Sequence, residues 1–220
     1  QIIENFFLPF FRGIFLEPHL NTSSRMFEFV FKMFSIGHAA IPAKGMGEIP
    51  EMLRKQLSKT QIFFDSPVDE VKGTEIYLKD GSSLEADKVI IATQPDKVMP
   101  QLQGQFAEPQ RVTILYFSTQ KSFIARPMIG LIPGTKGLIN NIVYMSDVSS
   151  EYSSEGRALL SVTVLDHDYS GDELVKKVQA ELERISRVKA EYFHHEKTYE
   201  IGYALPNLED LKYEIPPTAA

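Results

Sequence analysis

The apolar positions in the first sixty residues follow a helical period. Apolar side chains recur at helical spacing in residues 2–12 and 24–36. A turn that contains Gly45 and Gly47 then leads into a third amphipathic segment, which ends near residue 58. This part of the chain is therefore predicted to form three helices.

The period changes to two after residue 60. Strands are predicted at 61–64, 67–72, 75–79 and 82–93, and an Asp-Gly turn precedes the last of them. The run VIIA at 89–92 does not alternate, which is typical of a strand covered on both faces in a parallel sheet. No complete βαβ unit precedes it, so its parallel neighbours are supplied in another way or are missing from this chain.

Longer alternating segments follow residue 110 and predict an antiparallel sheet with one buried face. Ser170 and Glu173 are spaced as a capping box before a helix with apolar residues at 174, 175, 178, 182 and 185. The strands of this region are predicted at 111–119, 129–132, 138–147, 157–166 and 188–200.

Composition narrows the class of protein. The 220 residues are 43% hydrophobic, which is enough to bury a core in one large domain or two small ones. The net charge of −6 and the scattered Lys and Arg residues argue against nucleic-acid binding. With no cysteine, disulfides, thiolate nucleophiles and cysteine metal sites are excluded, and a cytoplasmic location is the default.

Phenylalanine is concentrated at the start of the chain, where nine of the fifteen Phe residues lie within the first 34 positions. These rings need a buried core, a membrane surface or an apolar ligand, and we favour the core. The most apolar run, residues 26–36, is too short to span a bilayer, which takes about 20 residues. Peripheral membrane contact stays open as an alternative.

Other candidate chemistry is weak, and we predict no metal site. Asp166, His167 and Asp168 have the composition of metal ligands, but polar residues are expected in a loop between a strand and a helix. His194 and His195 are adjacent, so on a strand they point to opposite faces. Taken alone, the turn at 45–47 is favoured as a plain turn over a helix N-terminus that binds an anion.

Two segments that follow one another in the chain form a pattern that is more specific than either segment alone. They are IPAKGMGEIPEMLRKQL at 41–57 and SPVDEVKGTEIYLKDGSSLEADKVIIATQP at 66–95. Together they resemble the flavin-dependent amine oxidases, a family that includes protoporphyrinogen oxidases and phytoene desaturases. The resemblance covers residues 41–95 well, the helical start moderately and 99–205 loosely, and Lys44 stands where the family often has glycine.

The resemblance implies that this chain is an internal α+β fragment of a two-domain FAD-binding α/β flavoprotein. Such a fragment would have a helical start, a small β-meander and a mixed to antiparallel sheet from the substrate domain. The implied assignment is 1–40 to the helical part of the substrate domain, 41–98 to the middle of the FAD-binding domain, 99–205 to the sheet of the substrate domain, and 206–220 to a tail.

The resemblance also implies contacts with FAD. The backbone of the family valine that matches Val68 meets the adenine, and Ala92 and Thr93 end a strand that runs toward the cofactor. Gly45, Met46 and Gly47 form the turn that is predicted to approach it. The G-x-G-x-x-G turn that holds the FAD phosphates is not in this sequence, so we expect the isolated chain to be inactive and not to retain FAD.

The implied function is an FAD-dependent oxidoreductase that removes hydride from an apolar or amine-bearing substrate. The resemblance points to no catalytic residue, since the flavin would carry the redox chemistry. The Phe-rich helices, together with Met26, Met33 and Met46, are predicted to line a site for a hydrophobic small molecule. Two alternatives stay open: a non-redox lipid- or prenyl-binding escort protein on the same fold, and an independent α+β binding domain.

Overall fold

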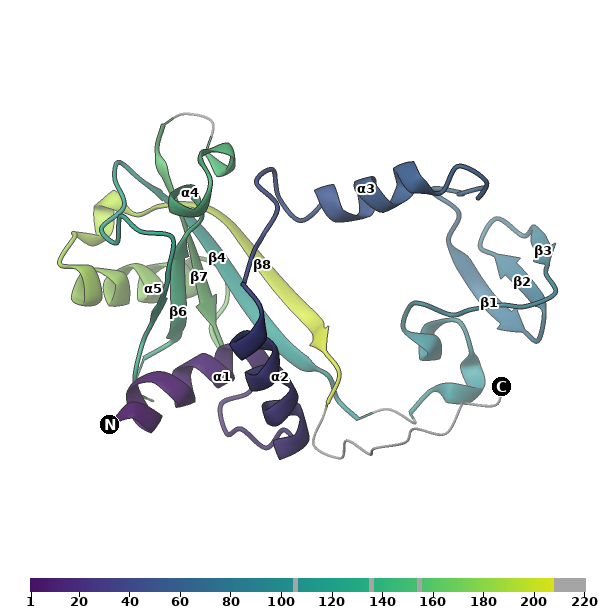
Figure 1. Ribbon diagram of the computed structural model, residues 1–220, viewed down its shortest axis with the longest axis horizontal. Coiled ribbons are helices and arrows are strands. Elements are labelled where there is room, and N and C mark those ends of the chain that lie inside the picture. The colour runs from purple at the N-terminus through teal and green to yellow at the C-terminus, as the bar shows by residue number, and fades with distance from the viewer. Residues whose placement is uncertain (105–106, 135–136, 154–155, 208–220) are drawn as a thin grey trace. The chain divides into compact units, whose positions relative to one another are not determined.

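The computed structural model describes residues 1–104, 107–134, 137–153 and 156–207 (Figure 1). The chain forms two compact units, which are described separately below. We call Arg54–Glu108 the meander unit, and Gln1–Leu53 together with the described residues from Pro109 onward the sheet unit. The assignment of these units to cofactor and substrate domains stays a prediction.

A five-stranded antiparallel sheet dominates the sheet unit, as the alternating pattern predicted. The strands are β4 (Gln110–Thr119), β5 (Ile129–Leu131), β6 (Ile139–Tyr144), β7 (Ala158–Val164) and β8 (His194–Leu205). They lie in the order β5-β6-β7-β4-β8. The last strand begins later than predicted, because a 3₁₀ turn at Ala190–Tyr192 precedes it.

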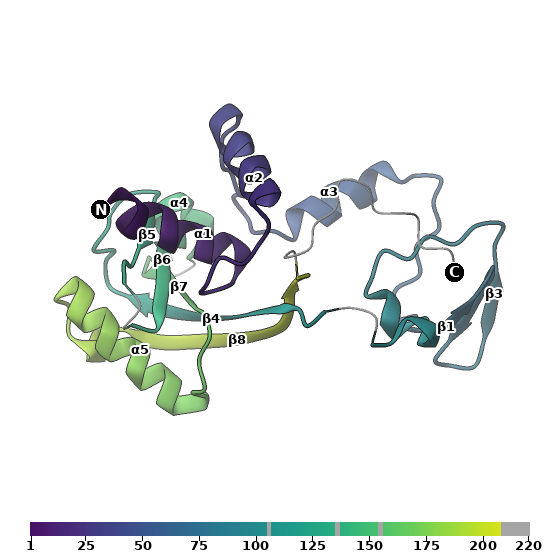
Figure 2. The same ribbon diagram turned by 90° about the horizontal axis from the view of Figure 1, so that it is seen from below.

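Helix α5 (Gly171–Ser186) covers one face of this sheet (Figure 2). The side chains of Leu174, Val178 and Leu182 are fully buried against strand residues such as Leu160, so the predicted helix and its apolar face are confirmed. The predicted capping box is wrong. Ser170 is the N-cap, but its side chain makes no capping hydrogen bond, because the next residue, Gly171, is left-handed (φ 52°).

The predicted N-terminal helices are also present. A π-helical turn, Ile3–Phe7, runs into α1 (Leu8–Phe15), and α2 (Ser24–Ile36) and α3 (Glu48–Gln56) follow. Helix α1 lies on the sheet face opposite α5 (Figure 2), where the side-chain amide of Asn140 donates to the carbonyl of Pro9 at 3.1 Å. Phe11 and Phe15 are buried, so the core interpretation holds for part of the Phe-rich start.

The meander unit contains the predicted antiparallel hairpins. Strands β1 (Val68–Lys72), β2 (Glu75–Leu78) and β3 (Ser83–Glu85) pair in sequence order. The second turn is closed by Asp80, whose carboxylate accepts from the backbone N–H and the hydroxyl of Ser82. These bonds hold the pKa of the Asp80 carboxyl below its usual value, with the hydroxyl bond as the largest cause.

Two strand predictions in this unit are wrong. Residues 61–64 and 89–92 form no strand, and Ile90 is 91% exposed. A strand needs a backbone partner, and β1–β3 pair only with one another among the described residues. Val89 and Ile91 instead pack on a small core around Val71 and Val98. The predicted tail from 206 lies almost entirely outside the described residues.

Candidate functional site

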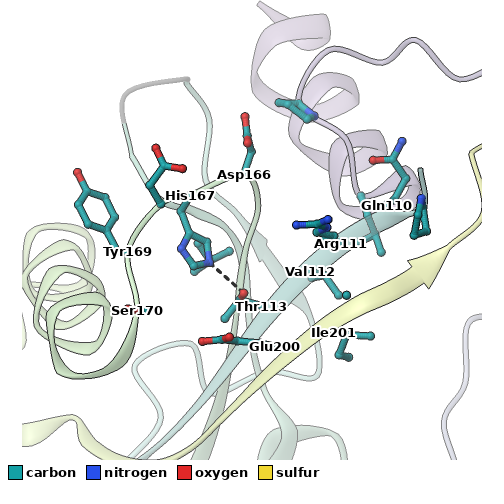
Figure 3. Close-up of a pocket in the computed structure, with 16 residues that line it drawn as sticks. Gln110, Arg111, Val112, Thr113, Asp166, His167, Tyr169, Ser170, Glu200 and Ile201 are labelled. Atoms are coloured by element: carbon teal, nitrogen blue, oxygen red, sulfur yellow. Dashed lines mark hydrogen bonds between the residues drawn. The ribbon is translucent and has the colours of Figure 1, made fainter. Parts of the chain in front are cut away.

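A cavity of about 700 Å³ lies in the sheet unit, where β4 begins and β7 ends (Figure 3). Four parts of the unit form it: the segment after α1, the start of β4, the loop between β7 and α5, and the middle of β8. These parts are far apart in the sequence, and the antiparallel pairing of β4 with both β7 and β8 brings them together.

The imidazole of His167 stands in the wall of this cavity (Figure 3). Its Nε2 lies 2.9 Å from the hydroxyl oxygen of Thr113, a buried residue of β4. Its Nδ1 is buried and has no hydrogen-bond partner among the described residues. A buried polar atom without a partner is uncommon in folded proteins, so this histidine is the chemically unusual group of the cavity.

The charges around the cavity are mainly negative. Asp166, Asp168 and Glu200 contribute three carboxylates, and Arg111 contributes one guanidinium. Residues 166–168, which the sequence predicts to be polar loop residues, do lie in a loop. Among the described residues, no group of three or more His, Asp or Glu side chains is arranged to hold a metal ion.

An apolar groove of about 300 Å³ follows the exposed side of α2. Its lining comes from the helix and the turn after it: Phe29, Val30, Met33, Phe34, Gly37, His38 and Ala39. Phe27 and Phe31, on another edge of α2, pack on α1 with ring centroids 4.6 Å from Phe11 and 6.1 Å from Phe7. Phe34 lines the groove and also packs on α1, with its ring centroid 5.4 Å from that of Phe10. The helix thus has one apolar edge packed on α1 and one uncovered edge that carries Phe29 and Met33.

The predicted cofactor turn forms as the sequence indicates. The N–H of Gly45, a left-handed residue (φ 99°), donates to the carbonyl of Pro42, and the carbonyl of Gly45 accepts from the N–H of Glu48 at the start of α3. Met46 is 60% exposed, and a Cβ added at Gly45 or Gly47 would meet no atom within 4 Å. The backbone of this turn is therefore accessible to a ligand.

The other predicted cofactor residues lie in the meander unit. Val68 begins β1 next to a bulge between Val68 and Glu70, and its side chain packs on the small core of that unit. Ala92 and Thr93 are exposed and lie outside any strand. Gly45, Met46 and Gly47 belong to the sheet unit, so the six residues do not form one cluster within either unit. Their roles stay predictions.

The sequence did not indicate the cavity. The groove falls within the Phe-rich helices that were predicted to line an apolar site, and of the three methionines named there Met33 lines it. Thr113 and His167 are 54 residues apart and share no motif. The apolar pattern of α2 did reveal an amphipathic helix, but the packed edge and the open edge have the same composition. Only the position of α1 distinguishes them.

Comparison with known proteins identifies the family. The family model described as flavin-containing amine oxidoreductase matches residues 1–219. The chain belongs to this family. The resemblance found in residues 41–95 is thereby confirmed. No curated protein matches the sequence.

Three solved structures have a similar fold. An oxidoreductase from Methanosarcina mazei matches 97% of this chain with a TM-score of 0.74 and 17% identity. A reduced UDP-galactopyranose mutase matches 94% of this chain with a TM-score of 0.67 and 13% identity. A protein from Pyrococcus furiosus matches 74% of this chain with a TM-score of 0.57 and 15% identity.

The chain spans only part of each of these proteins: 57%, 54% and 44% of their respective lengths. At these identities the similarity concerns the fold alone. It confirms the predicted class, an α+β part of a larger flavoprotein fold. No helix of the described residues has the length and apolar character needed to cross a membrane.

Proposed function

We propose that this chain is the substrate-binding and partial FAD-binding segment of an FAD-dependent oxidoreductase. The match of the family model over residues 1–219 carries the proposal. The flavin, when bound, accepts a hydride from the substrate. The substrate is apolar or amine-bearing, and the protein contributes binding, orientation and exclusion of water.

The proposed FAD contacts are considered for each unit separately. In the sheet unit, the open backbone at Gly45 and Gly47 supports close approach of a cofactor. In the meander unit, Val68, Ala92 and Thr93 stay proposed contacts that rest on the family resemblance. The glycine-rich turn that holds the phosphates is not in the sequence. The isolated chain is therefore proposed to retain no FAD and to be inactive.

The groove on α2 supports an apolar substrate. Phe29 is 57% exposed, although large aromatic side chains are usually covered in a folded protein. Met33 adds a flexible side chain that adapts to different shapes. Among the aromatic residues of this helix, Phe29 is the better candidate for substrate contact, because Phe27, Phe31 and Phe34 already pack on the rings of Phe11, Phe7 and Phe10.

The first test compares absorbance spectra of the protein expressed from the whole gene and of this 220-residue chain. We expect a flavin band in the longer protein alone. A stoichiometric flavin band in the short chain would contradict the claim of a partial site. No flavin in either protein, with a folded longer protein that takes up no added FAD, would overturn the oxidoreductase proposal and favour a non-redox binding protein.

The substrate groove is tested by anaerobic reduction of the flavin in the longer protein with benzylamine, which has both an apolar ring and an amine. Phe29→Gln is expected to raise the half-saturating concentration roughly tenfold, because apolar contact area is lost. Phe6→Gln, an exposed ring of the Phe-rich start outside the groove, is the matched control. Equal values for the wild type and Phe29→Gln would rule out the groove.

A further inference from the structure

The loop between β7 and α5 has an unusual backbone. Two left-handed residues bound it, Asp166 (φ 47°) and Gly171 (φ 52°). Aspartate adopts the left-handed region more readily than most residues with a Cβ atom, and here it marks a sharp change of backbone direction after β7. Contacts with the rest of the sheet unit then position the residues that follow.

One of those contacts is made by His167. Its Nε2 lies 2.9 Å from the Thr113 hydroxyl oxygen, and Figure 3 shows this bond joining the loop to β4. Thr113 is 7% exposed and is paired on both sides, with Val164 of β7 and Glu200 of β8. The hydrogen bond of the His167 imidazole therefore holds the loop against a strand that is paired on both sides.

The other ring nitrogen of His167, Nδ1, makes this hydrogen bond depend on the charge of the imidazole. In the neutral ring one nitrogen carries a proton and the other does not, and Nδ1 is left without a partner at a modest cost. In the protonated ring both nitrogens are donors and the ring is charged. A charged, buried N–H without an acceptor is much more costly, so the present pose suits the neutral imidazole.

The charged groups around the cavity offer a better place for the protonated ring. Carboxylates come from the loop itself, at Asp166 and Asp168, and from β8, at Glu200. Arg111 of β4 is the opposing cation, and the phenol of Tyr169 also lines the space. Three carboxylates outnumber one guanidinium, so a positive imidazole is attracted toward these carboxylates and away from Thr113.

We propose that His167 is a pH-sensitive latch on the β7–α5 loop. The neutral imidazole holds residues 165–170 against Thr113. When it gains a proton, the ring turns toward the carboxylates of the cavity, the bond to Thr113 breaks and the loop is released. This inference is independent of flavin binding, because every group involved lies within the sheet unit.

Amide hydrogen exchange in the 220-residue chain tests the latch. Exchange of residues 165–170 is measured at pH 7.5 and 5.5, a range in which histidines change charge, and is corrected for intrinsic rates. We expect roughly tenfold less protection at pH 5.5, since a charged unpaired donor disfavours the closed loop by at least that factor. Equal protection at both values would overturn the proposal.

Two variants and a control separate the latch from a general effect of pH. His167→Gln keeps an amide donor near Thr113 but gains no charge, so the pH dependence is expected to disappear. Thr113→Val removes the hydroxyl that bonds to the imidazole, so the loop is expected to be weakly protected at both values. His195→Gln is the matched control, because the Nε2 of His195 also lies 2.8 Å from a threonine hydroxyl but is exposed on β8.

Loss of the pH dependence in the His195 variant, or its persistence in the His167 variant, would contradict the latch. If Thr113→Val proves unfolded by circular dichroism, the comparison of the two histidine variants still decides the question.

Discussion

At the scale of single residues, the sheet unit depends on a few buried polar contacts. Glu181 of α5 is a buried acid whose carboxylate accepts from the backbone N–H of Leu138 at 2.7 Å and of Ile139 at 3.4 Å. This carboxylate occupies the space beside Gly137, where an added Cβ would lie 2.0 Å from Oε1. Because Gly137 has no side chain, the Glu181 carboxylate has room to accept hydrogen bonds from the backbone N–H groups at the start of β6.

Replacing Gly137 by Ala is expected to displace that carboxylate and to leave its backbone donors without an acceptor. The expected loss is about 1–3 kcal/mol in the free energy of unfolding, measured by urea denaturation. Gly202→Ala is the control, because a Cβ there meets no atom within 4 Å. A Gly137 variant as stable as the wild type would show that Glu181 has another satisfactory position.

Tyr144 is expected to make the free energy of unfolding depend on pH. Its buried hydroxyl lies 3.2 Å from the hydroxyl of Thr119, and burial, the largest cause, raises the pKa of the Tyr144 phenol above its ordinary value of 10.0. A raised pKa in the folded state means that the neutral phenol stabilises the protein. That contribution is complete below about pH 10 and is lost as the pH rises through the folded-state value.

The wild type should therefore lose stability above pH 10 more steeply than Tyr144→Phe, which has no proton to release. Urea denaturation at pH 8.5, 9.5 and 10.5 measures the difference. Tyr192→Phe, at a half-exposed position, should follow the wild type. Parallel curves for the wild type and Tyr144→Phe would contradict the prediction.

At the scale of elements, α2 has two apolar edges with different roles. Phe27 and Phe31 stack with each other and pack in tilted contacts on Phe11 of α1 and Phe7 of the turn before it, so one edge stabilises the helix pair. Phe29 lies on the other edge, in the groove, and is 57% exposed. The two edges can be tested by matched substitutions of the same residue type.

Phe27→Ala is expected to lower the free energy of unfolding by about 1–2 kcal/mol, because the ring contact with Phe11 and part of its apolar burial are lost. Phe29→Ala should change it by less than about 0.5 kcal/mol, as is usual for exposed positions. Chemical denaturation compares the two variants. Equal losses would mean that both edges are packed in solution.

At the scale of the whole molecule, the chain has two separate cores. The core of the sheet unit joins the strands to α5 and includes fully buried side chains such as Val162. Among the described residues, the core of the meander unit has four buried members: Val71, Val98, Met99 and Leu102. The smaller core buries less apolar surface, so we expect the meander unit to be the less stable of the two.

Segment-resolved hydrogen exchange checks this expectation with a pair of valine truncations. Val162→Ala should reduce protection in β4, β6 and β7, while the hairpins of β1–β3 keep theirs. Val71→Ala should have the reverse effect. If either substitution lowered protection throughout the chain, the two units would unfold as one cooperative body.

The sequence alone predicted those helices, strands and turns that depend on a few neighbouring residues. The helical period of residues 24–36, the alternation of 111–119 and the Asp-Gly turn at 80–81 each predicted what the structure contains, because backbone preference and one-sided burial act over a few neighbouring residues. Residues 41–95 were specific enough to indicate the family, which the family model confirms.

Tertiary structure decided everything that depends on distant partners. The run VIIA has the composition of a buried strand, but Ile90 is exposed because a strand exists only where another backbone pairs with it. The two edges of α2 differ only through the position of α1. The bond between His167 and Thr113 arises from the pairing of β4 with β7, a long-range contact that local sequence patterns do not encode.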